Sequence, residues 1–456
     1  MIKRSRTGWM ALAGGVIAAV AAAGSAWAQA AAAPAAAAAA PSLHAYQVAL
    51  ELDVGATSWI LTSTALVLLM TLPGLALFYG GMVRRKNVLA TIAQSVAVSA
   101  LVTVLWVVAG YSLSFGTATG AQEALNPFIG GFDALFLDGV RADTAHALTK
   151  GLPEYLWVAY QLTFAIITPA LIAGAFAERM KFSALLLFMG LWTLLVYAPI
   201  CHWVWGGGFL GSAGVLDFAG GAVVHVNSGV AGLVCALVLG KRTGFGRENF
   251  APHNLVLTSI GASLLLVGWI GFNAGSAWTA DAIASVALLN TILAPMAAAL
   301  AWMVVEWIER KKPTLLGLLS GMIAGLVGIT PAAGFVDPKG ALAIGLIAGV
   351  ACYAGAVWLK RLLKYDDSLD AFGVHGIGGI VGAVLTAVFA SASVNAAGAN
   401  ADVMKQLYGL GATIAWSAVA TFAILMVCKF TTGLRVTKEE EVEGLDTALH
   451  GESMHG

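Results

Sequence analysis

The chain has 456 residues, of which 59% are hydrophobic and only 11% are charged. Because soluble domains carry about 25% charged residues, this composition indicates an integral membrane protein rather than a soluble domain. The 24 basic and 24 acidic residues balance each other, so the net charge gives no indication of a nucleic-acid partner.

The N-terminal segment has the pattern of an export signal. Three basic residues among the first six precede an apolar run at about residues 9–23, and the small-residue motif "AWA" ends at Ala28. This pattern predicts a cleaved signal peptide over residues 1–28. The alternative is an uncleaved first helix, although the run is short for a membrane span. Residues 29–54, with their Ala-rich stretch, are predicted to be an exported leader.

Apolar runs of about 18 to 25 residues, long enough to cross a bilayer, recur eleven times after the leader. Basic clusters such as "RRKN" and "KRTGFGRE" fall at every second junction between these runs. Since cytoplasmic loops are enriched in Lys and Arg, the alternation places the mature N-terminus outside and the C-terminus inside. The runs centre near residues 68, 102, 165, 190, 231, 263, 292, 325, 351, 383 and 419.

Two of these spans share an unusual pattern. "AVVHVNSGVAGLV" contains His225 and "FGVHGIGGIVGAV" contains His375, and in each stretch glycines follow the histidine by four and seven residues. Asp217 and Asp367 precede their histidines by eight residues each. The histidines lie in the fifth and tenth spans, which predicts an inverted repeat of five plus five helices and one extra helix. The predicted repeat halves are residues 55–240 and 250–392, and the extra helix is residues 407–430.

An inverted repeat brings equivalent helices together, so we expect His225 and His375 to face each other near the middle of the membrane. Ionisable residues are costly there, and a functional role is the default expectation. Two other roles stay open: each histidine bonds a neighbouring helix, or both ligate a haem. Neutral imidazoles lining a narrow apolar pore suit a small molecule that both donates and accepts hydrogen bonds.

Aromatic residues flank the histidine spans in glycine-rich surroundings. "HWVWGGG" carries Trp205, "QLTFAIITP" carries Phe164, and "GWIGFNAGSA" carries Trp269, Phe272 and Ser276. Interfacial aromatic residues usually form a belt, but the neighbouring glycines favour close packing around a vestibule. No nucleophile, metal or nucleotide motif stands out, and the four cysteines are scattered. Neither a cofactor nor an enzyme activity is predicted.

From about residue 55 to its tail, the chain resembles bacterial members of the ammonium transporter (Amt/Rh) family. The resemblance rests on long motifs, among them "WVWGGGFLGSAGVLDFAGGAVVHVNSG", "IGFNAGSA", "GLVGITPAAG" and "DDSLDAFGVHGIGGIVG". One departure is Tyr160, which stands where the resemblance leads us to expect Phe.

The resemblance implies a role for each matching residue. Trp205, Phe164 and Ser276 would recruit ammonium at the outer mouth, and Phe164 and Phe272 would form a stacked gate. His225, His375 and Trp269 would line the pore, and Asp217 would be a buried acid that shapes the outer site.

The resemblance also implies an eleven-helix transporter domain at residues 55–433 and a cytoplasmic regulatory tail at residues 434–456. We expect a homotrimer in the lipid of the cytoplasmic (inner) membrane that transports ammonium or ammonia and binds a PII-type signalling protein at its cytoplasmic face. The alternative is an ammonium sensor on the same fold. A sensor would need an appended signalling domain, for which the short tail leaves no room.

Overall fold

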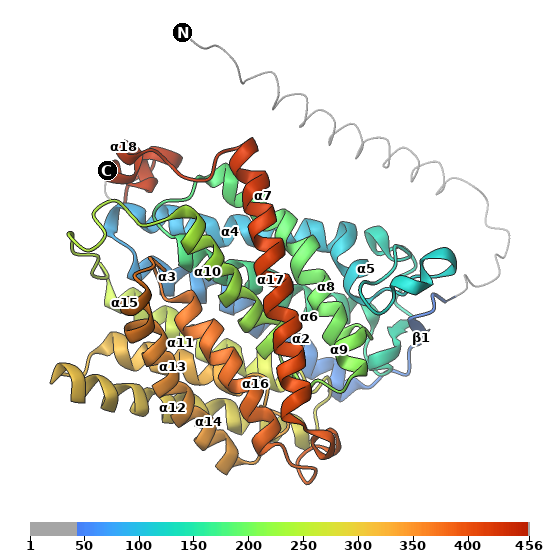
Figure 1. The fold of residues 1–456 in the computed structure, drawn as a ribbon. Helices are drawn as coiled ribbons and strands as arrows, with labels where there is room; N and C mark the ends of the chain where they lie inside the picture. Colours follow the sequence, from blue (N-terminus) through green and yellow to red (C-terminus); the bar gives the residue numbers. More distant parts are fainter. Residues whose placement is uncertain (1–42, 455–456) are drawn as a thin grey trace. The chain divides into compact units, whose positions relative to one another are not determined.

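The computed structural model describes residues 43–454. The predicted signal peptide and residues 29–42 of the predicted leader lie outside the described residues. The described chain is a helical bundle with one small two-stranded sheet (Figure 1). The prediction of an all-α polytopic membrane fold is confirmed at this level.

Ten helical segments among the described residues are long and apolar enough to cross a membrane. The predicted span near residue 325 is a shorter apolar helix, α13 (Leu315–Ile329). It is bounded by the N-cap Thr314 and by Pro331, whose ring cannot continue a helix. The count of eleven spans therefore stays a prediction. The ten segments are Val54–Met82, Arg85–Phe115, Glu154–Phe176, Phe182–Ser212, Gly221–Leu239, Leu255–Gly275, Ala282–Arg310, Pro338–Leu363, Phe372–Phe389 and Val403–Thr431.

Several segments contain more than one helix because short π-helical turns interrupt them. The remaining α-helices are α2 (Val54–Leu69), α3 (Ala76–Met82), α4 (Val88–Leu105), α5 (Tyr111–Phe115), α6 (Glu154–Phe176), α7 (Phe182–Trp192), α8 (Ala198–Trp205), α9 (Phe209–Ser212), α10 (Asn227–Leu239), α11 (Leu255–Gly275), α12 (Ala282–Arg310), α14 (Pro338–Tyr353), α15 (Lys360–Leu363), α16 (Ile377–Phe389), α17 (Val403–Thr431) and α18 (Lys438–Glu443).

The two ends of the bundle carry different features. Strands β1 (Gln47–Ala49) and β2 (Thr144–His146) pair antiparallel at one end, which we call the strand side. Helix α18 lies at the other end, which we call the tail side (Figure 1). The distribution of basic residues predicts that the tail side faces the cytoplasm.

A buried carboxylate holds the strand side together. Glu154, at the start of α6, is fully buried. It accepts hydrogen bonds from Gln47 at 2.7 Å, Tyr111 at 2.9 Å and Thr144 at 2.6 Å. These partners lie in β1, α5 and β2, so one side chain ties three separate segments to the start of α6.

Charged residues are concentrated in ion pairs on the tail side. Arg84 bonds Glu178 at 2.9 Å, and Arg242 bonds Glu178 at 3.4 Å and Asp366 at 2.8 Å. The ring of Phe250 lies beneath both guanidinium groups, 4.6 Å from that of Arg84 and 4.3 Å from that of Arg242. The network thus joins four loops, each of which lies next to the end of a candidate membrane span.

The tail packs on this same side. Glu441 bonds Arg435 at 2.7 Å and accepts from the backbone and hydroxyl of Thr243 at 2.7 and 3.0 Å. Asp446 accepts from the backbone of Ala90, in the first turn of α4, at 2.8 Å. The tail therefore clamps the loop after α10 and the start of α4.

Two π-helical turns cross at the centre of the fold. Turn η8 (Gly221–Val226) precedes α10, and η10 (Phe372–Gly376) precedes α16, from opposite sides of the bundle. A Cβ at Gly229 in α10 would lie 2.2 Å from the backbone N of Gly376. A Cβ at Gly379 in α16 would lie 2.9 Å from the backbone O of Gly221. Each helix therefore presses a glycine against the backbone of the other π turn.

We predict that Gly229→Ala destabilises the bundle by about 3 kcal/mol and separates η8 from η10, because backbone atoms cannot yield to the added methyl group. The control is Gly411→Ala in α17, where a Cβ would meet no atom within 4 Å and Ala is a better helix former by about 1 kcal/mol. Thermal unfolding of the purified variants measures the difference. Equal midpoints for the two variants would contradict the close approach at Gly229.

Candidate functional site

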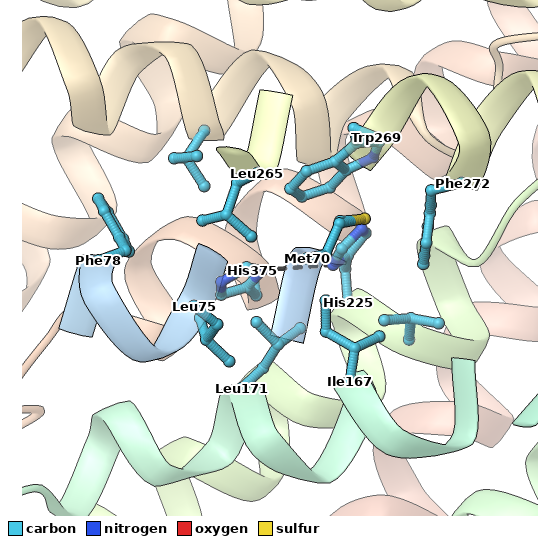
Figure 2. Close-up of a pocket in the computed structure, with 12 residues that line it drawn as sticks. Met70, Leu75, Phe78, Ile167, Leu171, His225, Leu265, Trp269, Phe272 and His375 are labelled. Atoms are coloured by element: carbon cyan, nitrogen blue, oxygen red, sulfur yellow. Dashed lines mark hydrogen bonds between the residues drawn. The ribbon is translucent and has the colours of Figure 1, made fainter. Parts of the chain in front are cut away.

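The two predicted histidines meet in the structure. His225 lies in η8 and His375 in η10, and both side chains are buried. Their Nδ1 atoms are 3.3 Å apart, and their rings stack with centroids 5.3 Å apart (Figure 2). A hydrogen bond between two Nδ1 atoms needs one donor and one acceptor, so the neutral pair holds opposite tautomers. One Nε2 is then an acceptor and the other is a donor.

Trp269 covers the histidine pair from α11. Its ring stacks on His225 with centroids 5.3 Å apart and an interplanar angle of 26°. Its indole N–H donates to the Thr330 hydroxyl at 2.9 Å. The indole is thus held with its face, rather than its N–H, toward the imidazole.

A small cavity adjoins these side chains. Its volume is about 10 Å³, and apart from His225, His375 and Trp269 its lining is apolar. The Nε2 of His225 is buried and has no hydrogen-bond partner among the described residues. A water molecule needs about 10 to 15 Å³ of such space, so the cavity fits one small molecule. The lining includes Met70, Leu171 and Ile167, and Figure 2 shows Leu171 and Ile167 on the opposite side from Trp269.

The two predicted gate residues are stacked, which closes the cavity toward the strand side. The rings of Phe164 in α6 and Phe272 in α11 have centroids 4.3 Å apart and an interplanar angle of 25°. Both side chains are buried. Phe272 also lies 6.1 Å from the ring of His225, so gate and histidine pair are direct neighbours.

Beyond the gate, the predicted outer residues border Phe164 and Phe272 on the strand side. The ring of Trp205 meets Phe164 edge-on at 5.8 Å, and it is partly exposed. Ser276, which ends α11, donates its hydroxyl to the carbonyl of Phe272 at 2.8 Å. Tyr160 meets Phe164 edge-on at 5.1 Å. Aromatic rings and a hydroxyl group therefore lie together beside the stacked pair.

Asp217 holds the backbone next to these residues. Its carboxylate accepts from the four N–H groups that begin η8, at 2.6 to 3.1 Å. Its own carbonyl accepts the indole N–H of Trp205 at 2.9 Å. Burial raises the pKa of the Asp217 carboxyl, and the backbone donors oppose that rise. The residue thus fixes both η8 and Trp205.

Asp367 has the equivalent position before η10. It accepts from the backbone N–H of Ala371 at 3.0 Å and of Phe372 at 2.8 Å. Burial raises the pKa of its carboxyl, and the negative charge of Asp370 adds to the rise. Both histidine-bearing turns are therefore capped by a buried aspartate.

A chain of cavities continues from His375 to the tail side. A second cavity of about 50 Å³ shares Phe78, Ile323 and His375 with the first. A third, of about 260 Å³, shares Ser320 and Asp370 with the second. The path is thus closed by aromatic rings on the strand side and widens toward the tail side.

The structure thus places two buried imidazoles in a small, otherwise apolar cavity beside two stacked aromatic rings, and the comparisons identify the family. The sequence profile of the Ammonium Transporter Family matches residues 58–455. The chain belongs to the ammonium transporter family. Together with the ten candidate spans, this membership makes it a multi-pass membrane protein.

Individual relatives of this family cover most of the chain. The ammonium transporter of Aquifex aeolicus is 49% identical over 423 residues, which is 91% of this chain and 96% of that protein. The crystal structure of Saccharomyces cerevisiae Mep2 has a TM-score of 0.78 and 37% identity over 86% of this chain and 89% of that one. A structure named Sensor Amt Protein has a TM-score of 0.79 and 28% identity over 87% and 98%.

The geometry argues against the haem alternative. The imidazoles of His225 and His375 stack on each other, and the volume of the adjoining cavity is only about 10 Å³. A macrocycle does not fit in such a cavity.

Three residues at the site were not predicted as site residues. Thr330 lies in the "GITPAAG" motif and Asp370 in "DDSLDAF", but nothing in either motif indicates a contact with Trp269 or with the inner cavity. Tyr160 was recognised only as a departure from the expected Phe. The position of its hydroxyl depends on packing between α6 and α11, which spacing along one helix does not reveal.

We predict that Thr330→Val lowers the free energy of unfolding by about 1 to 3 kcal/mol, because the buried indole N–H of Trp269 loses its acceptor. The control is Thr386→Val in α16, a buried threonine whose hydroxyl bonds the carbonyl of Gly382 in its own helix. Thermal unfolding compares the two. A larger loss in Thr386→Val would count against the orienting role of Thr330.

Proposed function

We propose that the protein carries ammonium across the membrane by binding NH4+ on the strand side, transferring one proton from it to water there, and passing NH3 along His225 and His375. The observation that carries the proposal is the hydrogen-bonded histidine pair in a cavity for one small molecule, directly behind two stacked rings. The names of the relatives agree with the substrate.

The entrance supports recruitment of a small cation. The rings of Trp205 and Phe164 have centroids 5.8 Å apart, and the Ser276 hydroxyl bonds the carbonyl of Phe272, whose ring stacks on Phe164. A cation over an aromatic face gains about 0.5 to 2 kcal/mol. Since the Ser276 hydroxyl donates to a carbonyl, its lone pairs remain available to accept from ammonium.

The gate and the cavity oppose passage of the charged form. A charge at the centre of a bilayer costs about 2.5 to more than 10 kcal/mol, which exceeds the gain at the entrance. No carboxylate lines the first cavity, whose polar groups are the two imidazoles and one indole already bonded to Thr330. Loss of a proton before the gate removes this cost.

The histidine pair suits NH3. Because the two tautomers are opposite, the pair offers one Nε2 acceptor and one Nε2 donor along the conduit. NH3 has both an acceptor lone pair and donor hydrogens, so it can bond each imidazole in turn. A net current with ammonium on one side only would show that the proton also crosses through the same pair, whereas a pH change without current would show that NH3 crosses alone.

A sensor on the same fold is the second candidate, because the Sensor Amt Protein shares the fold at a TM-score of 0.79. Its identity to this chain is 28%, compared with 49% and 48% for the ammonium transporters of Aquifex aeolicus and Bacillus subtilis. We therefore propose the transporter role.

Several expectations from the sequence belong to the same proposal. We propose an inverted repeat, supported by the reciprocal glycine contacts of α10 and α16 and by the aspartates that cap η8 and η10. The homotrimer, the PII-type partner, the inner-membrane location and the tail-side cytoplasmic orientation stay predictions.

We predict that the double variant His225→Ala with His375→Ala loses the ammonium-evoked current of reconstituted proteoliposomes by at least about tenfold, or carries ammonium without selectivity. The reason is that NH3 and the proton lose their hydrogen-bonding partners in the cavity. Solid-supported-membrane recordings measure the current, and a pH dye inside the vesicles measures net movement of NH3.

The matched control is His253→Ala, a half-buried histidine in the loop before α11, which should keep the wild-type current. A double variant with wild-type current and selectivity would contradict the proposed role of the histidine pair. A wild type that produces neither current nor pH change would favour the sensor.

We predict that Glu441→Ala releases the tail and lowers ammonium uptake several-fold, as truncation after Gly433 should also do, because the loop after α10 loses its clamp. The control is Glu439→Ala, an exposed glutamate in the same short helix. Limited proteolysis reports tail release and uptake reports activity. A released tail with unchanged ammonium uptake would contradict a regulatory role of the tail.

A further inference from the structure

The last turn of α11 has an incomplete set of backbone hydrogen bonds. The N–H of Ser276 bonds the carbonyl of Asn273 at 3.1 Å rather than that of Phe272, four residues before it. Carbonyls at a helix C-terminus need partners from outside the helix ladder. The carbonyl left over belongs to the gate residue Phe272.

Two side-chain hydroxyls bond this carbonyl. Ser276 donates to it at 2.8 Å, and the hydroxyl of Tyr160 in α6 lies 3.2 Å from it. The Tyr160 hydroxyl also lies 3.1 Å from the carbonyl of Gly271 and 3.4 Å from the oxygen of Ser276. Only Tyr160 bonds from another helix, so it joins α6 to the end of α11.

The Tyr160 side chain is tightly packed around its hydroxyl group. Tyr160 is fully buried, and a Cβ at Gly275 would lie 2.6 Å from its hydroxyl oxygen. The Tyr160 ring meets Phe164 edge-on at 5.1 Å, and Phe164 stacks on Phe272 at 4.3 Å. One tyrosine thus contacts the first gate ring with its own ring and the second gate residue with its hydroxyl.

We propose that the Tyr160 hydroxyl is a latch that fixes the end of α11 against α6, and that it thereby sets both the gap between the gate rings and the position of Ser276. Tyr160 is a positioning residue for selection between ammonium and its larger methylated analogue. The inference rests on the proposed function. A phenylalanine at this position would keep the ring contacts and lose the latch.

The test is Tyr160→Phe, compared with wild type in proteoliposomes. Without the latch, Ser276 is held less firmly and the rings can separate further. We expect the KM for ammonium to rise about three- to tenfold, the loss that one hydrogen bond gives, with the maximal rate within about twofold. We expect the rate of methylammonium relative to ammonium to rise at least about threefold. An unchanged KM and an unchanged ratio would overturn the latch.

The matched control is Tyr155→Phe. Tyr155 lies in the same helix, and its hydroxyl donates to the carbonyl of Val140 at 2.9 Å, away from the gate. The control removes the same kind of bond, so it should leave KM and the ratio unchanged. Equal shifts in both variants would overturn the proposal, since the effect would then be general to α6.

A measurement that needs no transport separates this inference from the proposed function. Hydrogen–deuterium exchange of the backbone at residues 271–278 should be several-fold faster in Tyr160→Phe than in wild type or Tyr155→Phe. Unchanged exchange overturns the latch even if the wild type transports ammonium. If the wild type transports nothing and exchange still accelerates, the latch stands and the proposed function fails.

Discussion

The site depends on the close approach of two helices through glycine. At Gly229 and Gly379 the backbone of one helix lies against the π turn that carries the histidine of the other. Only residues without a side chain permit backbones to approach so closely. The approach brings the two Nδ1 atoms within 3.3 Å. The hydrogen bond, the opposite tautomers and the size of the cavity all follow from this crossing.

Ionic groups lie away from the first cavity. Its lining contains no carboxylate, lysine or arginine, and the structure concentrates ion pairs among Arg84, Glu178, Arg242 and Asp366 on the tail side. Asp217, near the entrance, is bonded to four backbone N–H groups instead of to a cation. Its carboxylate thereby holds a π turn, and its backbone carbonyl separately accepts the indole N–H of Trp205.

The histidine pair could be predicted from the sequence because the same pattern of residues occurs in two spans. Equal spacing of aspartate, histidine and glycine in two spans predicted a facing pair, and His225 and His375 do face each other. The resemblance to a known family supplied the roles of Phe164 and Phe272, and the structure stacks their rings.

Other features could not be predicted, because they depend on contacts between distant segments. The pairing of β1 with β2 joins residues nearly a hundred positions apart, and Glu154 secures it from a third segment. The contact of Thr330 with Trp269 joins α11 to the end of α13. Apolar periodicity fixes which runs are helical, but it carries no information on which hydroxyl meets which indole.

The π turns explain how a single span can direct its histidine to the cavity and its glycine to the partner helix. A π turn holds one residue more than an α turn, so the helix after it is rotated by about 100° relative to an uninterrupted helix. In η8 and α10 this rotation occurs between Asp217, which caps the turn, and Gly229, which meets η10. His225 lies in the turn itself and is directed to the cavity. Because η10 repeats the arrangement from the opposite side, the two imidazoles meet at the centre while both glycines still face the partner helix.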